Sequence, residues 1–466
     1  MAKMTDRGLE NREIILDILT EVLEKGSFVH LVLSQALYKY QYLDKSDRAF
    51  ITRVTEGTLE YLIQLDYVID QFSKTKTGKM KPFIRNLLRM SVYQLLYMDR
   101  VPDSAVCNEA VKLAVKRKFQ GLKGFVNGVL RTISREKGKL VFDSPSLRYS
   151  IPQWMYDMWS REYGEEGAGR IAASFLRESP TWVRCNVSRA SMEEIRTSLE
   201  GQGVVVTPLK GMETMISISG YDYLDSLEAF REGWIQAQDV SSAFVGELAA
   251  PKQGDYIIDV CAAPGGKSLH LADKLSGTGF VEARDLTPQK VALIEENIVR
   301  CQASNMGAVQ WDALVYDPSA EAKADIVIAD LPCSGLGILG KKPDIKYNMT
   351  EEKLRELAAL QREILSVVWQ YVKPGGLLVY STCTIDRLEN EENAAWLASK
   401  FPLEPVDLEG RLQGGPEILA GSEQALPGCI QFLPGFDEPS LKQGRIQFLP
   451  GILPFDGFFI SLFRRQ

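Results

Sequence analysis

The pattern of apolar and polar residues divides the chain into a helical beginning and an α/β end. Within residues 11–26, apolar pairs recur every four positions, which places them along one side of a helix. These pairs are Ile14 with Ile15, Ile18 with Leu19, and Val22 with Leu23. Similar spacing recurs over 84–96 and 106–115. The pattern therefore predicts an all-α bundle over residues 1–140.

The middle of the chain has a mixed pattern. Pro145 and Pro152 lie within residues 142–154, and because proline is poorly tolerated inside helices, this stretch is expected to be a linker. Residues 150–240 then combine a short alternating run, a helix-like stretch that ends in glycines, and two further β-like runs. This combination predicts a small α+β module of the RRM-like kind.

After Trp234, short apolar runs alternate with helical stretches, which is typical of a parallel sheet covered by helices. The pattern predicts an α/β Rossmann-like domain over residues 241–466. Its expected strands are 255–260, 279–285, 308–312, 325–330, 376–382 and 456–463. Four of them finish at or beside an acidic residue or a cysteine. Because ligands bind beyond the carboxyl ends of the strands in such sheets, these residues are expected to converge on one cleft.

The stretch VCAAPGGKSLH (260–270) ends like a phosphate-binding loop but does not meet its requirements. Cys261 stands where that loop needs its first glycine, which argues against a nucleoside triphosphate. The adjacent Gly265 and Gly266 do not fit the dinucleotide pattern either. The stretch predicts a strand, a tight turn and a helix that starts near Lys267. Because the two glycines have no side chains, a ligand other than a nucleoside triphosphate or a dinucleotide can approach the backbone of this turn closely.

Two carboxylates suggest what that ligand is. Asp285 ends the second expected strand, where it can accept hydrogen bonds from both hydroxyls of a ribose. Asp312 ends the third, where it can accept from an exocyclic amine such as that of adenine. Either residue alone could simply cap a turn or a helix. Together with the glycine turn, they indicate S-adenosylmethionine.

Two thiols follow the next strands. Cys333 comes after the fourth strand, close to Asp330, and Cys383 comes after the fifth. If these strands are neighbours, both sulfurs face the same space. Most cysteines are buried and structural, but two thiols at strand ends beside a methyl donor suggest covalent catalysis.

Composition and charge narrow the class further. Hydrophobic residues make up 45% of the chain, but no apolar run is suited to a signal peptide or a membrane span. The protein is therefore expected to be cytoplasmic and without membrane contact. The seven cysteines form no C-x-x-C pair and there are only two histidines, so no metal is expected.

The charged residues are distributed unevenly along the chain. Residues 1–140 hold 24 Lys and Arg against 16 Asp and Glu, whereas the remainder holds 30 against 45. The basic residues bunch at 74–89 and 112–139, which suits a surface that neutralises phosphates or, more plainly, a solvated helix face.

Four long motifs resemble those of the RNA cytosine-C5 methyltransferases. They are VCAAPGGKS, ADLPCSGLGILGKKPDIKY, LVYSTCTIDRLENEEN and LPFDGFFISLFRR. The basic helical start resembles the antitermination factor NusB, and the combination resembles the RsmB (Sun) type of bacterial 16S rRNA methyltransferase over nearly the whole chain. Two departures are Leu331, where Ala is commoner, and a doubled IQFLPG segment at 430–435 and 446–451, whose copies could compete for one strand position.

The resemblance implies a substrate, a cofactor and a set of site residues. The substrate would be cytosine 967 of 16S rRNA in an unassembled or partly assembled small subunit, the cofactor S-adenosylmethionine, and the protein a monomer. The catalytic residues would be Cys383 as nucleophile, Cys333 for proton removal and release of the adduct, and Asp330 at the base. The cofactor site would comprise Cys261, Ala262, Ala263, Pro264, Gly265, Gly266, Lys267, Asp285, Asp312 and Asp330.

The chemistry explains why thiols are useful here. Carbon 5 of cytosine is a weak nucleophile until a thiolate adds at carbon 6, so covalent catalysis divides a difficult step into two easier ones. The site must favour the thiolate, by the cofactor's charge or by Lys267. A paired target base must also leave its stack, which favours looped RNA as the substrate.

Two alternative functions stay open. One is a non-catalytic RNA-binding or antitermination factor, against which the intact thiol motifs argue. The other is a DNA cytosine-C5 methyltransferase, which would need only the Pro-Cys thiol.

Overall fold

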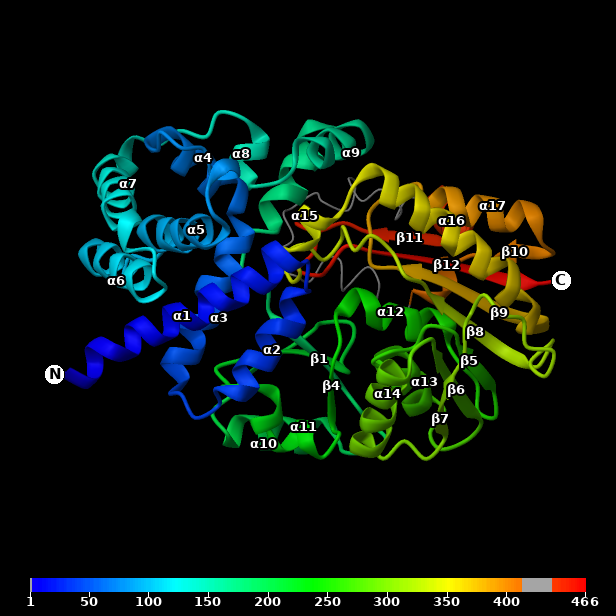
Figure 1. Ribbon diagram of the computed structural model, residues 1–466. Helices are drawn as coiled ribbons and strands as arrows, with labels where there is room; N and C mark the ends of the chain where they lie inside the picture. The colour runs from blue at the N-terminus through cyan, green and yellow to red at the C-terminus, as the bar shows by residue number, and fades with distance from the viewer. Residues whose placement is uncertain (1, 413–437) are drawn as a thin grey trace. The chain divides into compact units, whose positions relative to one another are not determined.

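A computed structural model describes residues 2–412 and 438–466 (Figure 1). The chain forms two compact units. The first comprises Met1–Leu176 together with Leu339–Asn348, and the second comprises Arg177–Ile338 together with Met349–Gln466. Among the described residues, no helix combines the length and the apolar character needed to cross a membrane.

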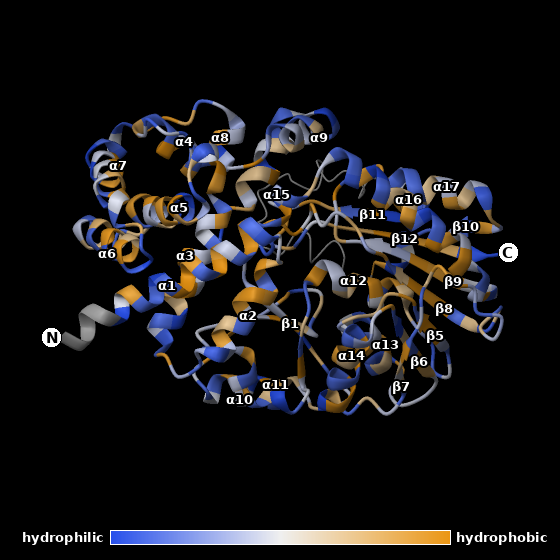
Figure 2. Ribbon diagram, in the orientation of Figure 1, coloured by the Kyte–Doolittle hydropathy of each residue, from blue (hydrophilic) through white to orange (hydrophobic). Residues whose placement is uncertain are grey.

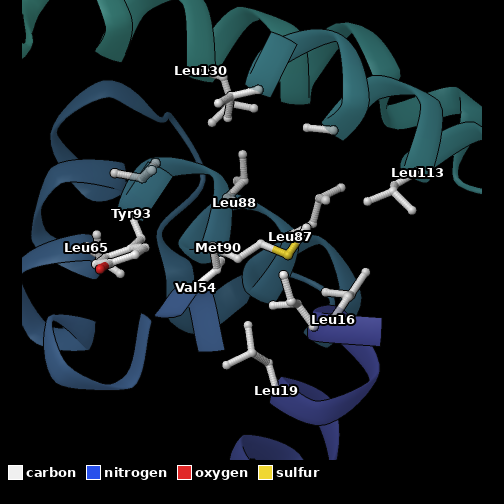
Figure 3. Packing of buried hydrophobic residues seen from close by; sticks show 14 of the residues in the cluster. Leu16, Leu19, Val54, Leu65, Leu87, Leu88, Met90, Tyr93, Leu113 and Leu130 are labelled. Carbon is white, nitrogen blue, oxygen red and sulfur yellow. The ribbon is translucent and has the colours of Figure 1, made fainter. Parts of the chain in front are cut away.

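The first unit is helical, as the apolar spacing predicts. Its helices are α1 (Ala2–Lys25), α2 (Val29–Lys39), α3 (Lys45–Glu60), α4 (Leu62–Phe72), α5 (Pro82–Tyr97), α6 (Asp103–Lys116), α7 (Lys123–Glu136), α8 (Pro145–Tyr149), α9 (Gln153–Ser174) and α15 (Ile345–Asn348). Leu16 and Leu19 of α1 point toward Leu87 and Met90 of α5 in one buried cluster (Figure 3). Helix α5 contributes seven buried apolar residues to this cluster, so it forms the centre of the bundle.

The stretch expected to be a linker is instead part of the first unit. Pro145 opens α8 and Pro152 is the residue before α9. Proline is favourable at both places, because the first helical N–H groups have no partner within the helix. The Ser150 hydroxyl accepts from the backbone N–H of Ile63 at 3.2 Å, so the stretch packs on the bundle.

Residues 339–348 join the first unit although they follow the Cys333 loop in sequence. The Nζ of Lys346 donates to the backbone carbonyls of Glu60 at 2.7 Å and of Ser150 at 3.1 Å. The hydroxyl of Tyr347 donates to the carbonyl of Leu59 at 2.6 Å. Burial lowers the pKa of Lys346 to about 7. The segment is thus held by three hydrogen bonds to the backbone of the helical unit.

The second unit begins with a small antiparallel sheet in the order β2-β3-β1-β4. Its strands are β1 (Thr181–Cys185), β2 (Val205–Pro208), β3 (Met215–Ser219) and β4 (Ile235–Ala237). Its helices are α10 (Met192–Gly201) and α11 (Glu228–Arg231). The Ser191 hydroxyl and the Glu194 carboxylate cap the start of α10 reciprocally, which fixes where that helix begins.

The larger sheet has the order β10-β12-β9-β8-β5-β6-β7 over the described residues, with β11 paired to β12. Its strands are β5 (Tyr256–Asp259), β6 (Phe280–Asp285), β7 (Met306–Gln310), β8 (Ala324–Asp330), β9 (Val372–Thr382), β10 (Leu403–Pro405), β11 (Arg445–Phe448) and β12 (Phe458–Arg465). Strands β5 to β9 pair in parallel and β12 is antiparallel to β9. The strands are largely hydrophobic (Figure 2). This mixed sheet confirms the predicted Rossmann-like fold.

Helices cover this sheet and connect its parallel strands. They are α12 (Val240–Ala249), α13 (Gly266–Lys274), α14 (Pro288–Cys301), α16 (Glu351–Val368), α17 (Glu391–Lys400) and α19 (Glu438–Lys442). Strand order runs from β5 to β6 and β7 in one direction and from β5 to β8 and β9 in the other. The order therefore reverses between β5 and β8, and open α/β sheets bind ligands at such a point.

Some strand predictions differ from the structure in their bounds. Strand β7 begins and ends two residues before the expected 308–312, so that Asp312 lies beyond its end. Strand β10 was not expected, and β11 takes the strand position for which the two IQFLPG copies were expected to compete. The second IQFLPG copy forms most of β11, which pairs with β12, whereas the first copy and Cys429 lie outside the described residues.

Candidate active site

The turn after β5 is built from small residues and ends in a backbone conformation that favours glycine. The N–H of Ala262 donates to the carbonyl of Arg284 in β6 at 2.8 Å, which ties the turn to the neighbouring strand. Gly265 has φ +101°, in the left-handed region. Helix α13 then begins at Gly266, one residue before the expected position.

Asp285 is bonded directly to this turn. Its carboxylate is buried at the end of β6, where it accepts from the N–H of Ala263 at 3.0 Å and of Leu286 at 2.8 Å. The Nζ of Lys290 lies 3.1 Å from the same carboxylate. The structure therefore brings Asp285 and the glycine turn together, as the sequence predicts.

Asp312 lies close to the end of β6 but is engaged in its own turn. The N–H of Trp311 donates to the carbonyl of Asp285 at 3.0 Å, which sets the position of the segment. The Asp312 carboxylate accepts from the N–H of Leu314 at 3.0 Å, as a turn aspartate does. A role in cofactor binding remains a prediction for this residue.

Lys267 and Asp330 form an ion pair at the reversal of strand order. The Lys267 Nζ lies 2.6 Å from the Asp330 carboxylate, which also accepts from the Ser381 hydroxyl at 2.8 Å. Burial lowers the pKa of Lys267, but the charge and hydrogen bond of Asp330 and the charges of Asp259 and Cys383 outweigh it, so the pKa is raised overall. Lys267 is therefore a cation paired with Asp330.

Asp259, at the end of β5, is an additional charged group that the sequence analysis did not single out. It is buried and accepts from the Ser268 hydroxyl at 2.6 Å. Burial raises its pKa to about 7, with Lys267 opposing and Asp330 adding to the rise. Its place at a strand end, two residues before Cys261, was the available signal.

The two thiols meet. The Sγ atoms of Cys333 and Cys383 lie 3.3 Å apart, and both side chains are half-buried. Strands β8 and β9 pair Asp330 with Ser381, and the N–H of Gly337 donates to the carbonyl of Cys383 at 3.1 Å. The hydrogen bond to Cys383, burial, and the negative charges nearby raise the pKa of Cys333 well above its usual range. Cys333 therefore holds its proton, and either sulfur can be the donor in the contact between the two thiols.

The polar residues that follow the thiols are buried and bonded to one another, which the sequence analysis missed. The hydroxyls of Ser334 and Thr384 lie 2.7 Å apart. The Glu389 carboxylate accepts from the N–H of Ser334 at 2.9 Å. The signal was the polar run of the LVYSTCTIDRLENEEN motif, which could have been read as a solvated loop. No group of three His, Cys, Asp or Glu that could hold a metal occurs within residues 2–412 and 438–466.

The helical unit divides its basic residues between ion pairs and the surface. Arg85 pairs with Glu24 and Arg89 with Asp66, both at 2.6 Å. By contrast, the side chains of a second group are exposed, and we call this group the surface lysines: Lys74, Lys79, Lys118 and Lys123.

The two basic stretches also contain an aromatic pair. Phe83 and Phe119 stack with centroids 4.6 Å apart, and the Nζ of Lys81 lies 5.6 Å from the Phe119 ring. This contact joins the start of α5 to the turn before α7, so the two basic stretches of the sequence meet at one place.

Comparison with protein families divides the chain into three matched regions. Residues 247–464 match the family described as 16S rRNA methyltransferase RsmB/F. Residues 9–135 match the NusB family, and residues 151–221 match the RsmF/B-like ferredoxin-like domain.

Relatives and solved structures cover the whole length. The chain is 34% identical to the probable ribosomal RNA small subunit methyltransferase B of Bacillus subtilis over 98% of both chains. It is 32% identical to the ribosomal RNA small subunit methyltransferase B of Cronobacter sakazakii, again over 98% of both. The solved structure of PH0851 is 25% identical and superposes with a TM-score of 0.79 over 98% of this chain and 99% of that one. A methyltransferase homologue from Pyrococcus horikoshii shares the fold, with 24% identity and a TM-score of 0.55 over 69% of this chain and 98% of that one.

Proposed function

The chain belongs to the family of ribosomal RNA small subunit methyltransferase B proteins, and on that basis we propose that it methylates carbon 5 of a cytosine in 16S rRNA, at position 967, through a covalent bond between Cys383 and carbon 6. The observation that carries this proposal is the pair of thiols 3.3 Å apart at the ends of neighbouring strands. A methyltransferase that acts on an amine or a hydroxyl has no need for either thiol.

S-adenosylmethionine is the methyl donor, and the residues beyond β5 and β6 suit it. The small side chains from Cys261 to Gly265 leave backbone within reach of a ligand, and the Asp285 carboxylate stands at the strand end where a ribose is held in related sheets. When bound, the donor supplies a methyl group activated by a sulfonium charge. We assign its binding to Cys261, Ala262, Ala263, Pro264, Gly265, Gly266, Lys267, Asp285, Asp312 and Asp330.

Cys383 is the nucleophile. The Cys333 thiol lies 3.3 Å from the Cys383 sulfur and can donate a hydrogen bond to it, and in the proposed mechanism this bond favours the thiolate that attacks. The sulfur–carbon 6 bond forms as the electron pair of the carbon 5–carbon 6 double bond moves to carbon 5. After carbon 5 has gained the methyl group, it must lose a proton, the double bond reforms, and the sulfur–carbon 6 bond breaks.

Cys333 receives that proton. The largest cause of its raised pKa is the hydrogen bond to Cys383. Because Cys383 carries the base during the second half of the reaction, that hydrogen bond is lost and the pKa of Cys333 falls. The Cys333 thiol can then release its own proton to water, and the thiolate that remains accepts the carbon-5 proton.

Asp330 holds the polar edge of the base. One carboxylate oxygen accepts from Lys267 and the other from Ser381, so the carboxylate is fixed in orientation. A fixed carboxylate that bonds the amino group of cytosine would distinguish it from uracil, which has a carbonyl oxygen at that position.

The helical unit supplies phosphate contacts. The surface lysines offer charge for a phosphate backbone, and the Phe83–Phe119 pair offers aromatic rings for bases. We propose that a monomer binds 16S rRNA before the small subunit is fully assembled, while the target loop is accessible.

Bisulfite sequencing tests the proposal. Purified protein, S-adenosylmethionine and a 16S rRNA transcript should give a single cytosine that resists deamination, at position 967. A methylated DNA strand, or methyl transfer that leaves every cytosine of the rRNA sensitive, would contradict it.

A further inference from the structure

We infer that Glu389 is a positioning residue that holds the loop of Cys333 against the loop of Cys383 through hydrogen bonds. This inference rests on the proposed use of both thiols. Glu389 acts through the residues beside the two sulfurs. Its position is at the end of the loop that follows β9, one residue before Asn390 and the start of α17.

The Glu389 side chain is fully buried and holds Ser334, the residue after Cys333. One carboxylate oxygen accepts from the Ser334 N–H at 2.9 Å, and the other is bonded to the Ser334 hydroxyl. Both the backbone and the side chain of Ser334 are therefore fixed by one carboxylate.

Gln361 of α16 fixes the residue on the other side of Cys333. Its amide nitrogen donates to the carbonyl of Pro332 at 2.9 Å and to Glu389 at 2.9 Å. The Gln361 oxygen in turn accepts from the hydroxyl of Tyr380 in β9 at 2.9 Å. Cys333 thus lies between two residues, Pro332 and Ser334, that Glu389 and Gln361 hold together.

The bond network also reaches the loop of Cys383. The Ser334 hydroxyl lies 2.7 Å from the hydroxyl of Thr384, the residue after Cys383. Because Ser334 is bonded to Glu389 on one side and to Thr384 on the other, the network joins the residues that follow the two thiols. The 3.3 Å separation of the sulfurs depends on that connection.

The shape of the side chain decides whether it can do this. Glu389 must reach Ser334 and Gln361 at once, and aspartate is one methylene shorter. Glutamine has the same length: its oxygen can accept from the Ser334 N–H and from Gln361, while its nitrogen donates to the Ser334 hydroxyl, which then donates to Thr384. A positioning role therefore predicts that glutamine replaces Glu389 and that aspartate does not.

A role for the negative charge makes the opposite prediction. Burial raises the pKa of Glu389 to about 7, and the groups whose charges act on it or respond to it are Asp386, Cys333 and Tyr380. If the charge mattered, for example as a proton acceptor, aspartate would preserve the function and glutamine would abolish it.

A dithiol reagent measures the geometry without RNA or cofactor. Phenylarsine oxide forms two arsenic–sulfur bonds with a close pair of thiols, and its oxygen leaves as water with the two thiol protons. Its affinity for the full-length protein would be titrated in wild type and in the Glu389→Gln, Glu389→Asp and Glu389→Ala variants. Cys333→Ser gives the background from the remaining cysteines. Glu392→Ala, an exposed residue of α17, is the matched control.

We expect affinity close to that of wild type for Glu389→Gln and Glu392→Ala. We expect a loss of about tenfold or more for Glu389→Asp and Glu389→Ala, the scale of one or two lost hydrogen bonds. Wild-type affinity in Glu389→Ala would overturn the inference, and so would loss in Glu389→Gln combined with retention in Glu389→Asp. If Glu389→Ala fails to fold, as circular dichroism would reveal, the comparison of Asp with Gln decides.

The consequence for the reaction is a second readout. A displaced Cys333 should leave protein joined to methylated RNA on denaturing gels in Glu389→Asp, as we expect for Cys333→Ala, with unchanged affinity for S-adenosylmethionine. If Cys333→Ala itself joins no RNA, the proposed reaction fails, and the arsenical titration still decides the role of Glu389.

Discussion

The helical unit and the larger sheet use charged residues in opposite ways. In the helical unit the surface lysines stay exposed, and ion pairs such as Lys25 with Glu21 lie at the surface, with side chains 61% and 42% exposed. At the strand ends, Asp259 and Asp285 are buried, and the side chains of Lys267 and Asp330 are only 16% and 25% exposed. Exposed charges act weakly and are screened by salt, whereas buried ones must be paired and resist screening. The comparison suggests that the sheet carries the chemistry and the helical unit carries the affinity for RNA.

The thiols at the strand ends should give the largest effects. Cys383→Ala should lower the methylation rate by at least about 10³-fold, the scale on which loss of a nucleophile acts in covalent catalysis. It should form no covalent complex with RNA. Cys333→Ala should attack and transfer the methyl group but stall before release, so that the protein remains joined to RNA on denaturing gels. A trapped complex in Cys383→Ala instead would reverse the roles and match the DNA methyltransferases.

The Lys267–Asp330 pair tests whether buried charges at the strand ends depend on one another. Lys267→Met should destabilise the second unit by about 2 kcal/mol, because it leaves the Asp330 carboxylate without its cation. The double variant Lys267→Met/Asp330→Asn should recover part of that loss, as measured by urea unfolding. Lys25→Met, at an exposed pair, should change nothing measurable. Equal effects of the two lysine substitutions would break the comparison.

Asp285 should affect the cofactor rather than the fold. Asp285→Ala should weaken the binding of S-adenosylmethionine by more than about 1.5 kcal/mol, because it removes a charged acceptor and releases the N–H of Ala263. Asp312→Ala should cost less, since the Asp312 carboxylate is already engaged in its own turn. Calorimetry that shows unchanged affinity for Asp285→Ala would contradict the cofactor assignment.

The surface lysines should give the smallest effect per residue and the one most sensitive to salt. Replacing Lys79 and Lys118 by glutamine should reduce the slope of log affinity for RNA against log salt by less than about one unit for each lysine. Cofactor binding should not change. Filter binding over a series of salt concentrations measures the slope, and an unchanged slope would place the RNA contacts elsewhere.

The sequence could predict most of the larger sheet, because its strands are apolar runs with a clear end. It also predicted that Cys333 and Cys383 share one space, since parallel neighbours bring their carboxyl ends to one edge. The stretch over Pro145 and Pro152 was read wrongly as a linker, because a proline weakens a helix interior but suits its first turn. Pro145 opens α8 and Pro152 precedes α9. The stretch packs on the bundle through a contact between Ser150 and Ile63, two residues far apart in sequence.

Asp259 and Glu389 could not have been identified by their residue type. Both are acidic residues that are usually exposed, and their burial depends on partners from other segments. The partner of Asp259 is Ser268, and the partners of Glu389 are Ser334 and Gln361. Pairings across loops of this kind follow from strand order, which the residue pattern alone did not establish.

The segment 339–348 has a consequence for how the protein is made. The chain leaves the second unit after Ile338, contributes Lys346 and Tyr347 to the helical unit, and returns at Met349. During synthesis, the N-terminal helices emerge from the ribosome long before these two residues, since Lys346 follows Glu60 by 286 positions. Until then the carbonyls of Leu59, Glu60 and Ser150 lack these donors. The helical unit, although its helices are synthesised first, therefore completes its hydrogen bonds only after more than half of the second unit has been synthesised.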